Sequence, residues 1–172
     1  MVKKIIILSV FLNISLIYSQ KLKTIEHEKY EIKVPENWEE NKMFYSNSLS
    51  LTIMKPKSDS DMNPVEAIGV KHVKSKESSF EGGYIEYISF LKGYYKENFK
   101  ILETENLTSN NYPIRKLIVE TKSRINGKKR RNIMVYSFKD NESMMLTLTG
   151  TKENFDCNLD LYAKVYESWK IK

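Results

Sequence analysis

The sequence has few of the residues from which catalytic and metal sites are usually built. Its 172 residues include one cysteine, Cys157, and two histidines, His27 and His72. A single cysteine cannot form an internal disulfide, so core packing alone has to hold the fold. A zinc site needs three or four Cys, His or carboxylate ligands at workable spacing, and these three residues make a poor set. We therefore expect no metal and no cofactor.

The sequence also lacks the pattern of a hydrolytic triad, which places a histidine beside a nucleophile and an acid. Both histidines lie in expected strands among Lys and Glu, and no Gly-x-Ser-x-Gly motif is near. Residues 59–63, DSDMN, begin like a calcium loop, but Pro64 and Val70 replace the glycine and bidentate Glu of the EF-hand pattern. We expect a solvated turn there and a non-enzymatic protein. An enzyme that uses carboxylates alone is the weaker alternative.

An apolar leader, MVKKIIILSVFLNISLIYS, occupies residues 1–19. Lys3 and Lys4 precede an interrupted apolar stretch at 5–17, and the small residue Ser19 precedes a polar run. This layout predicts a signal peptide cleaved near Ser19 and a mature chain that is periplasmic or secreted. The alternative is an uncleaved anchor helix, which needs about 20 apolar residues. No cysteine lies near the cleavage position, so we expect no lipid anchor attached there.

The mature chain, residues 20–172, is long enough for one domain with a real core. The whole-chain charge of +6 falls to +4 when Lys3 and Lys4 are removed. A charge of this size favours solubility and weak attraction to anionic surfaces, but it is not the footprint of a nucleic-acid-binding protein. We found no long linker, low-complexity tract or internal repeat. We therefore expect a single domain with no nucleic-acid partner.

Alternating and helical patterns predict an α+β domain with a mostly antiparallel sheet. The dipeptide Asn126-Gly127 is the strongest hairpin signal, because both central residues of a type I′ turn need positive φ. A first helix is expected near 84–98, and a second is expected to begin at a cap on Thr151 or Asn154. Central strands such as RKLIVE are apolar on both faces, so we expect the helices to cover opposite faces. The expected strands cover residues 26–34, 48–55, 65–73, 101–107, 112–125, 128–139 and 142–151.

Most aromatic and sulfur-containing side chains are interpreted as core. Spacings of three and four predict that one stripe of the first helix packs inward, formed by Tyr84, Ile88, Leu91 and Tyr95. The strand methionines Met134, Met144 and Met145 fit the same role. Cys157 lies beside the main apolar stripe of the last helix, and we expect a partly buried, inert thiol there.

The segment YEIKVPENW, residues 30–38, combines an alternating strand, a proline turn and a tryptophan. Together with the helix YIEYISFLKGYYKENF and the terminal YESWKI, it resembles the PsbP-like and DcrB-like family of exported proteins. The resemblance implies an α/β/α sandwich in which Trp38 is a structural plug. It also implies a small accessory, assembly or binding subunit with no shared catalytic residues, whose partner is an unidentified protein or envelope component.

The densest charge cluster follows the Asn-Gly turn and consists of Lys128, Lys129, Arg130 and Arg131. With Lys122 and Arg124 on the preceding strand, it would form a basic hairpin tip. Clustered charge of this kind can bind anionic lipid, polysaccharide or an acidic partner. The alternative is a solvated edge whose charges prevent sheet-to-sheet aggregation. We name these four residues as the candidate binding site.

Overall fold

The computed structural model describes residues 20–41, 49–56, 66–109, 111–122 and 127–172. The expected signal peptide, most of the expected 55–64 loop and Asn126 of the hairpin turn lie outside these residues. Gly127, which is described, has the positive φ of 67° that the Asn-Gly turn requires. No helix within the described ranges is long and apolar enough to cross a membrane.

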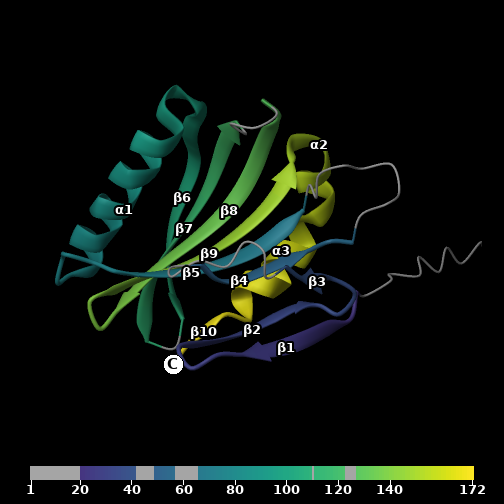
Figure 1. Cartoon of the computed structure of the whole chain (residues 1–172), viewed down its shortest axis with the longest axis horizontal. Helices are drawn as coiled ribbons and strands as arrows, with labels where there is room; N and C mark the ends of the chain where they lie inside the picture. The colour runs from purple at the N-terminus through teal and green to yellow at the C-terminus, as the bar shows by residue number, and fades with distance from the viewer. Residues whose placement is uncertain (1–19, 42–48, 57–65, 110, 123–126) are drawn as a thin grey trace, which may run out of the picture.

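A seven-stranded sheet forms the centre of the molecule (Figure 1), and each neighbouring pair of its strands is antiparallel. The strand order is β3-β4-β5-β9-β8-β7-β6, so β6 to β9 form a meander and β5 joins it alongside β9. The antiparallel α+β architecture predicted from sequence is confirmed. The strands are β3 (Glu39–Glu40), β4 (Leu49–Met54), β5 (Ala67–Lys74), β6 (Phe99–Ser109), β7 (Tyr112–Lys122), β8 (Lys129–Lys139) and β9 (Glu142–Thr151).

A second, three-stranded sheet consists of β1 (Leu22–Glu26), β2 (Tyr30–Pro35) and β10 (Lys170–Ile171), with β2 in the middle. The single strand expected at 26–34 was wrong. The chain turns after Glu26, where the His27 amide donates to the Tyr30 carbonyl at 2.9 Å and the Lys29 amide donates to His27 Nδ1 at 3.2 Å. Residues 22–35 therefore form a hairpin separate from the large sheet.

Helix α1 (Phe80–Tyr95) covers one face of the large sheet. Its Ile88 and Leu91 pack on a cluster contributed by β7, β8 and β9, as the predicted stripe required. The helix begins four residues earlier than predicted, because the Ser79 hydroxyl accepts from the Gly82 amide at 3.1 Å and caps the first turn. Gly83 lies directly against Tyr136, where only a missing side chain permits so close an approach.

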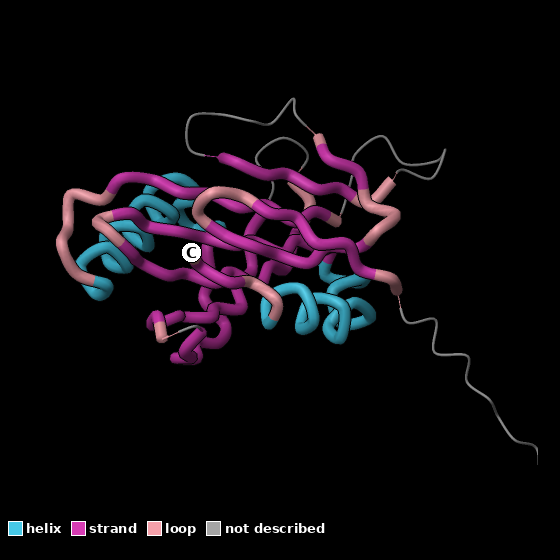
Figure 2. Tube along the Cα trace, turned by 90° about the horizontal axis from the view of Figure 1, so that it is seen from below, coloured by secondary structure: helices cyan, strands magenta, loops and turns pink. Residues whose placement is uncertain are grey.

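The other face is covered by α2 (Lys152–Phe155), α3 (Leu159–Glu167) and the small sheet. Figure 2 shows the helices, in cyan, as two separate bodies beside the strands. Thr151 caps α2 by accepting from the Asn154 amide at 3.1 Å, as one of the two expected caps. The expected terminal helix is divided by a 3-10 turn at Asp156–Asn158. The predicted cover on both faces is confirmed.

Most of the core residues predicted from sequence are buried, whereas Tyr84 and Tyr95 of the α1 stripe are half-buried against the core. Trp38 is 1% exposed within the cluster that joins the two sheets, and Met134, Met144 and Met145 are also buried. Cys157 is exposed, which contradicts the expected partly buried thiol. The 3-10 turn rotates this position away from the apolar stripe that a continuous helix would have presented.

Candidate functional site

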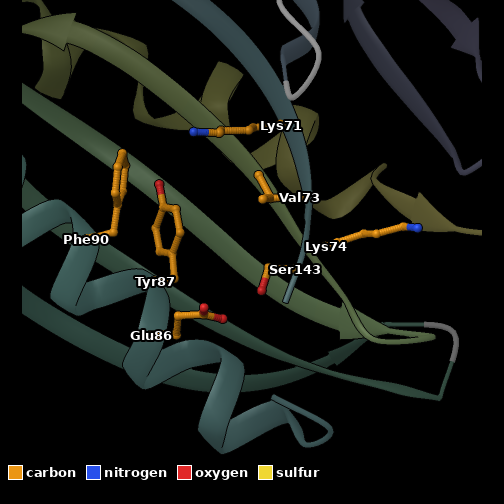
Figure 3. A pocket seen from close by; sticks show the side chains of 7 residues that line it. All are labelled: Lys71, Val73, Lys74, Glu86, Tyr87, Phe90 and Ser143. Carbon is orange, nitrogen blue, oxygen red and sulfur yellow. The ribbon is translucent and has the colours of Figure 1, made fainter. Parts of the chain in front are cut away.

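A hollow of about 170 Å³ lies between α1 and the β5–β9 part of the large sheet. Figure 3 shows its lining side chains, which come from these three elements. We call it the α1–β5 cleft and define it by Lys71, Val73, Lys74, Glu86, Tyr87, Phe90 and Ser143. The segment after β5 holds the two walls together at one end, because the Ser75 hydroxyl donates to Glu86 at 2.6 Å and the Ser75 amide donates to the Asn141 carbonyl at 2.9 Å.

Phe90 of the cleft and the neighbouring Tyr94, which lies outside the cleft lining, expose aromatic surface on α1. Phe90 is 54% exposed and Tyr94 is 48% exposed, and their stacked rings lie 6.2 Å apart between centroids. They are four positions apart on α1, so they form a second apolar row beside the stripe that packs on the sheet. Val73 of β5 is 39% exposed on the opposite wall. Exposed aromatic side chains gathered in this way are typical of a binding surface.

Lys71 supplies a half-buried cation at the cleft. Its ammonium lies 5.0 Å from the centroid of the Phe90 ring, within the range of a cation–π contact. Burial lowers the pKa of this lysine, because desolvation disfavours its charged form. Among the described residues, no carboxylate forms an ion pair with Lys71.

Tyr87 lies at the base of the cleft beside Phe90, with 6.4 Å between the ring centroids. Burial raises the pKa of its hydroxyl, which therefore remains a neutral donor. Figure 3 shows the hydroxyl of Tyr87 and the ammonium of Lys71 at the same end of the cleft, whereas the Lys74 ammonium points away. No residue in the described ranges forms a hydrogen bond with the Tyr87 hydroxyl.

Glu86 and Ser143 already have polar partners. Glu86 Oε2 accepts from the Ser75 hydroxyl at 2.6 Å and from the Lys76 amide at 3.4 Å. The hydroxyl of Ser143 shares a hydrogen bond of 3.1 Å with Tyr136. The cleft thus combines aromatic walls, a lysine and a tyrosine hydroxyl, a set that can bind an amphipathic group by contact and charge.

The structure brings together His27 and His72, whose ring centroids lie 6.0 Å apart. His27 stacks on Tyr30, and the neighbouring Lys29 forms an ion pair with Glu142 of β9. Across the part of the chain that the structure describes, no group of three or more His, Cys, Asp or Glu side chains is placed to hold a metal ion. The contacts His27–His72 and Lys29–Glu142 join the small sheet to the large one. No sequence pattern predicts this pairing, because His27 and His72 belong to different sheets.

A second hollow, of about 370 Å³, lies on the opposite face where β6 and β7 pass the end of α3. Leu107, Ile114 and Val135 contribute to its lining, and Tyr166 lies at its side. Lys116 within it forms an ion pair with Glu105 and lies 5.1 Å from the Tyr166 ring. The cation here already has a carboxylate partner, unlike Lys71 in the α1–β5 cleft.

The predicted basic tip lies at the start of β8, where Lys128 and Lys129 are exposed. Arg130 and Arg131 are half-buried, and as neighbours in one strand their side chains leave opposite faces of the sheet. Arg131 reaches the α2 side, 5.6 Å from the Phe155 ring and 3.5 Å from Asp156. Lys129 is 3.9 Å from Glu120. Arg124 lies outside the described residues, and Lys122 is exposed.

Sequence reasoning missed the α1–β5 cleft. A usable signal was present on α1, where Phe90 and Tyr94 repeat at a spacing of four but fall off the predicted core stripe. The position of Lys71 in the cleft could not be predicted from sequence, because it is one of many lysines in alternating strands. Its burial depends on where α1 crosses the sheet.

No protein-family model matches the chain, and no curated protein matches it. Several solved structures do match in fold. The solution structure of cyanobacterial PsbP (CyanoP) from Synechocystis is 10% identical with a TM-score of 0.66, and the match covers 89% of this chain and 94% of that one. The Ran-binding protein Mog1p of Saccharomyces cerevisiae is 8% identical with a TM-score of 0.62, covering 89% and 96% of the two chains.

LpqN of Mycobacterium tuberculosis, described as involved in cell envelope biogenesis, is 13% identical with a TM-score of 0.59, covering 88% of this chain and 91% of that one. At these identities the likeness is one of fold. The PsbP-like resemblance expected from YEIKVPENW is therefore confirmed as a shared architecture, and the DcrB-like part of it stays a prediction.

Proposed function

We propose that the protein is a non-enzymatic binding or accessory protein, exported after cleavage near Ser19, which docks a partner protein at the α1–β5 cleft. The observation that carries this proposal is that Phe90 of α1 and Val73 of β5, on opposite walls of the cleft, are both solvent-exposed beside a half-buried lysine. Aromatic side chains are enriched in protein interfaces, where their large rings are desolvated on binding. In the free protein 54% of the Phe90 surface and 39% of the Val73 surface are exposed.

The structural neighbours support the proposal only through their shared fold. Mog1p is described as a Ran-binding protein, and LpqN is described as involved in cell envelope biogenesis. One architecture thus serves proteins with different roles, as expected when function is carried by a surface built on a common fold. The α1–β5 cleft would be the corresponding surface of this chain.

In-cell photocrosslinking tests the docking site. A photoreactive amino acid at Phe90 should capture a discrete partner protein that mass spectrometry identifies. The same residue at Lys33, an exposed position on β2 far from α1, is the matched control. Equal capture at both positions, or no capture at Phe90, would contradict docking at the cleft.

Export is tested separately by the mass of the protein recovered from outside the cytoplasm. We expect a chain that begins at or near Gln20, because Ser19 is the small residue at the end of the apolar leader. Recovery of the full-length chain in the membrane fraction would instead identify an uncleaved anchor.

A second candidate function is docking of the basic tip on anionic lipid or polysaccharide. The exposed Lys128 and Lys129 at the start of β8 favour it. Changing Lys128, Lys129 and Arg130 to Gln, with Arg131 retained because it contacts Asp156 and Phe155, should abolish binding to phosphatidylglycerol vesicles at low salt. If the triple variant binds as well as the original, the tip is a solvated edge and this function is excluded.

A further inference from the structure

The geometry points to the class of partner that the α1–β5 cleft selects. We propose that it binds an acidic segment of a partner protein, in which one apolar side chain enters the hollow and an adjacent carboxylate binds Lys71. The inference rests on the proposed function, because it takes the cleft to be a docking surface for protein.

The size of the hollow decides between a small-molecule ligand and an inserted side chain. Drug-sized ligands and cofactors occupy pockets of about 300 to 1,000 Å³. A cavity of about 150 Å³ holds one benzene molecule. The α1–β5 cleft, at about 170 Å³, therefore fits one aromatic or branched aliphatic side chain.

The walls suit such an anchor. Phe90 and Tyr87 of α1 face Val73 of β5 across the hollow, and more than half of the Phe90 surface remains exposed. An inserted ring would bury both walls at once. Anchor side chains in apolar pockets of this kind dominate the binding energy of protein interfaces.

Charge then decides what flanks the anchor. Lys71 is half-buried and pairs with no carboxylate in the described ranges, so an incoming carboxylate offsets the cost of its desolvation. The Tyr87 hydroxyl offers a second donor to the same group. Glu86 is the acidic residue of the cleft, and its Oε2 is engaged by Ser75 and the Lys76 amide.

The second hollow does not share this preference. Its Lys116 already pairs with Glu105, so an added carboxylate there would compete with an existing ion pair. The acidic preference therefore belongs to the α1–β5 cleft.

Peptide display on the mature chain, residues 20–172, tests the inference. Random 12-residue peptides are selected on the original protein after removal of those that bind a Phe90→Asp variant. We expect the enriched peptides to place Asp or Glu within two residues of Phe, Trp, Leu or Ile. The best synthetic peptide should bind about tenfold more weakly to Lys71→Gln, because a hydrogen bond to a charged group is lost. Binding to Lys100→Gln, an exposed lysine on β6, should be unchanged.

The outcomes separate the two proposals. Cleft-dependent peptides that lack acidic residues, or equal binding to Lys71→Gln and the original, overturn the acidic preference and leave docking at the cleft intact. Absence of any Phe90-dependent peptide overturns both. Sodium laurate serves as the small amphiphile, and stronger binding of laurate than of every selected peptide would assign the cleft to a lipid and overturn the inference.

Discussion

At the scale of one residue, the burial of Trp38 could be predicted from the short pattern of strand, proline and tryptophan. The Pro35 turn returns the chain so that the Trp38 amide donates to the Pro35 carbonyl at 3.1 Å. The side chain is then buried, and its indole Nε1 has no hydrogen-bond partner among the described residues. Packing therefore accounts for its position, as the sequence predicted.

Replacing Trp38 by Ala should lower the free energy of unfolding by about 3 to 5 kcal/mol, because a large buried ring leaves a cavity. Urea unfolding of the purified mature chain measures this loss. Trp38→Phe is the matched control and should cost clearly less, since it keeps a ring and removes a donor without a described partner. A loss below about 1 kcal/mol for the alanine variant would contradict the structural role.

Lys71 shows the opposite case, in which sequence was uninformative. Its neighbours in β5 alternate normally, and nothing in their order separates a half-buried lysine from an exposed one. Its environment is created by Phe90, which reaches it only through tertiary packing. The candidate site at Lys128 to Arg131 could be named from sequence, because a run of consecutive basic residues is recognisable without a structure.

At the scale of an element, helix α1 contains two glycines, Gly83 and Gly93, whose surroundings differ. From sequence, both Gly83 and Gly93 appear as weak points of a helix. A Cβ on Gly83 would lie 2.5 Å from the Tyr136 hydroxyl and 2.8 Å from Phe138 Cδ2, whereas a Cβ on Gly93 would meet nothing within 4 Å. Gly83 is thus required for close packing of α1 on the sheet, and Gly93 is not.

We therefore expect alanine substitutions at the two glycines to change the stability of the protein in opposite directions. Gly83→Ala should destabilise the protein by about 1 to 3 kcal/mol, because overpacking exceeds the gain in helix propensity. Gly93→Ala should stabilise it by about 0.5 to 1 kcal/mol, since the propensity gain meets no steric opposition. Thermal unfolding of the two variants beside the original measures both. Equal effects of the two substitutions would mean that α1 does not approach β8 as closely as described.

Other elements show where sequence patterns reach their limit. The strands β7, β8 and β9 were predicted within a few residues because turn signals bound each of them. The hairpin of β1 and β2 was read as one strand, because Glu26 to Lys29 contain no glycine or proline. The break between α2 and α3 was missed for a similar reason, since its residues also permit a continuous helix.

At the scale of the whole molecule, the junction of the two sheets contains opposed titrating groups. His72 faces Lys29, Glu142, His27 and Glu28. Its burial, together with the Lys29 charge, holds the pKa of His72 below the ordinary 6.5. The hydrogen bond from Lys29 holds the pKa of Glu142 below its ordinary 4.5. Both groups therefore resist protonation in the folded state.

The stability of the protein should fall in two stages on acidification. A group with a lowered folded pKa stabilises the fold fully above its unfolded pKa, and this contribution is lost as pH falls. His72 predicts a loss that begins near pH 6.5, and Glu142 predicts a further loss below about pH 4.5. Unfolding free energies measured between pH 8 and 3 give the profile. His72→Gln should flatten the first stage and Glu142→Gln the second; an unchanged profile in either variant would contradict its assignment.

The order of strands in the large sheet has a kinetic consequence. The strands β6, β7, β8 and β9 each pair with their neighbour in sequence, whereas the pairing of β5 with β9, here called the seam, joins residues as distant as Val70 and Leu146. Closing a long loop costs more entropy before any contact repays it, so local pairings form early. The meander should therefore be the folding nucleus, and the seam should form after the rate-limiting step. Ile133→Val in β8 should slow refolding in stopped-flow experiments, while Val70→Ala at the seam should mainly accelerate unfolding.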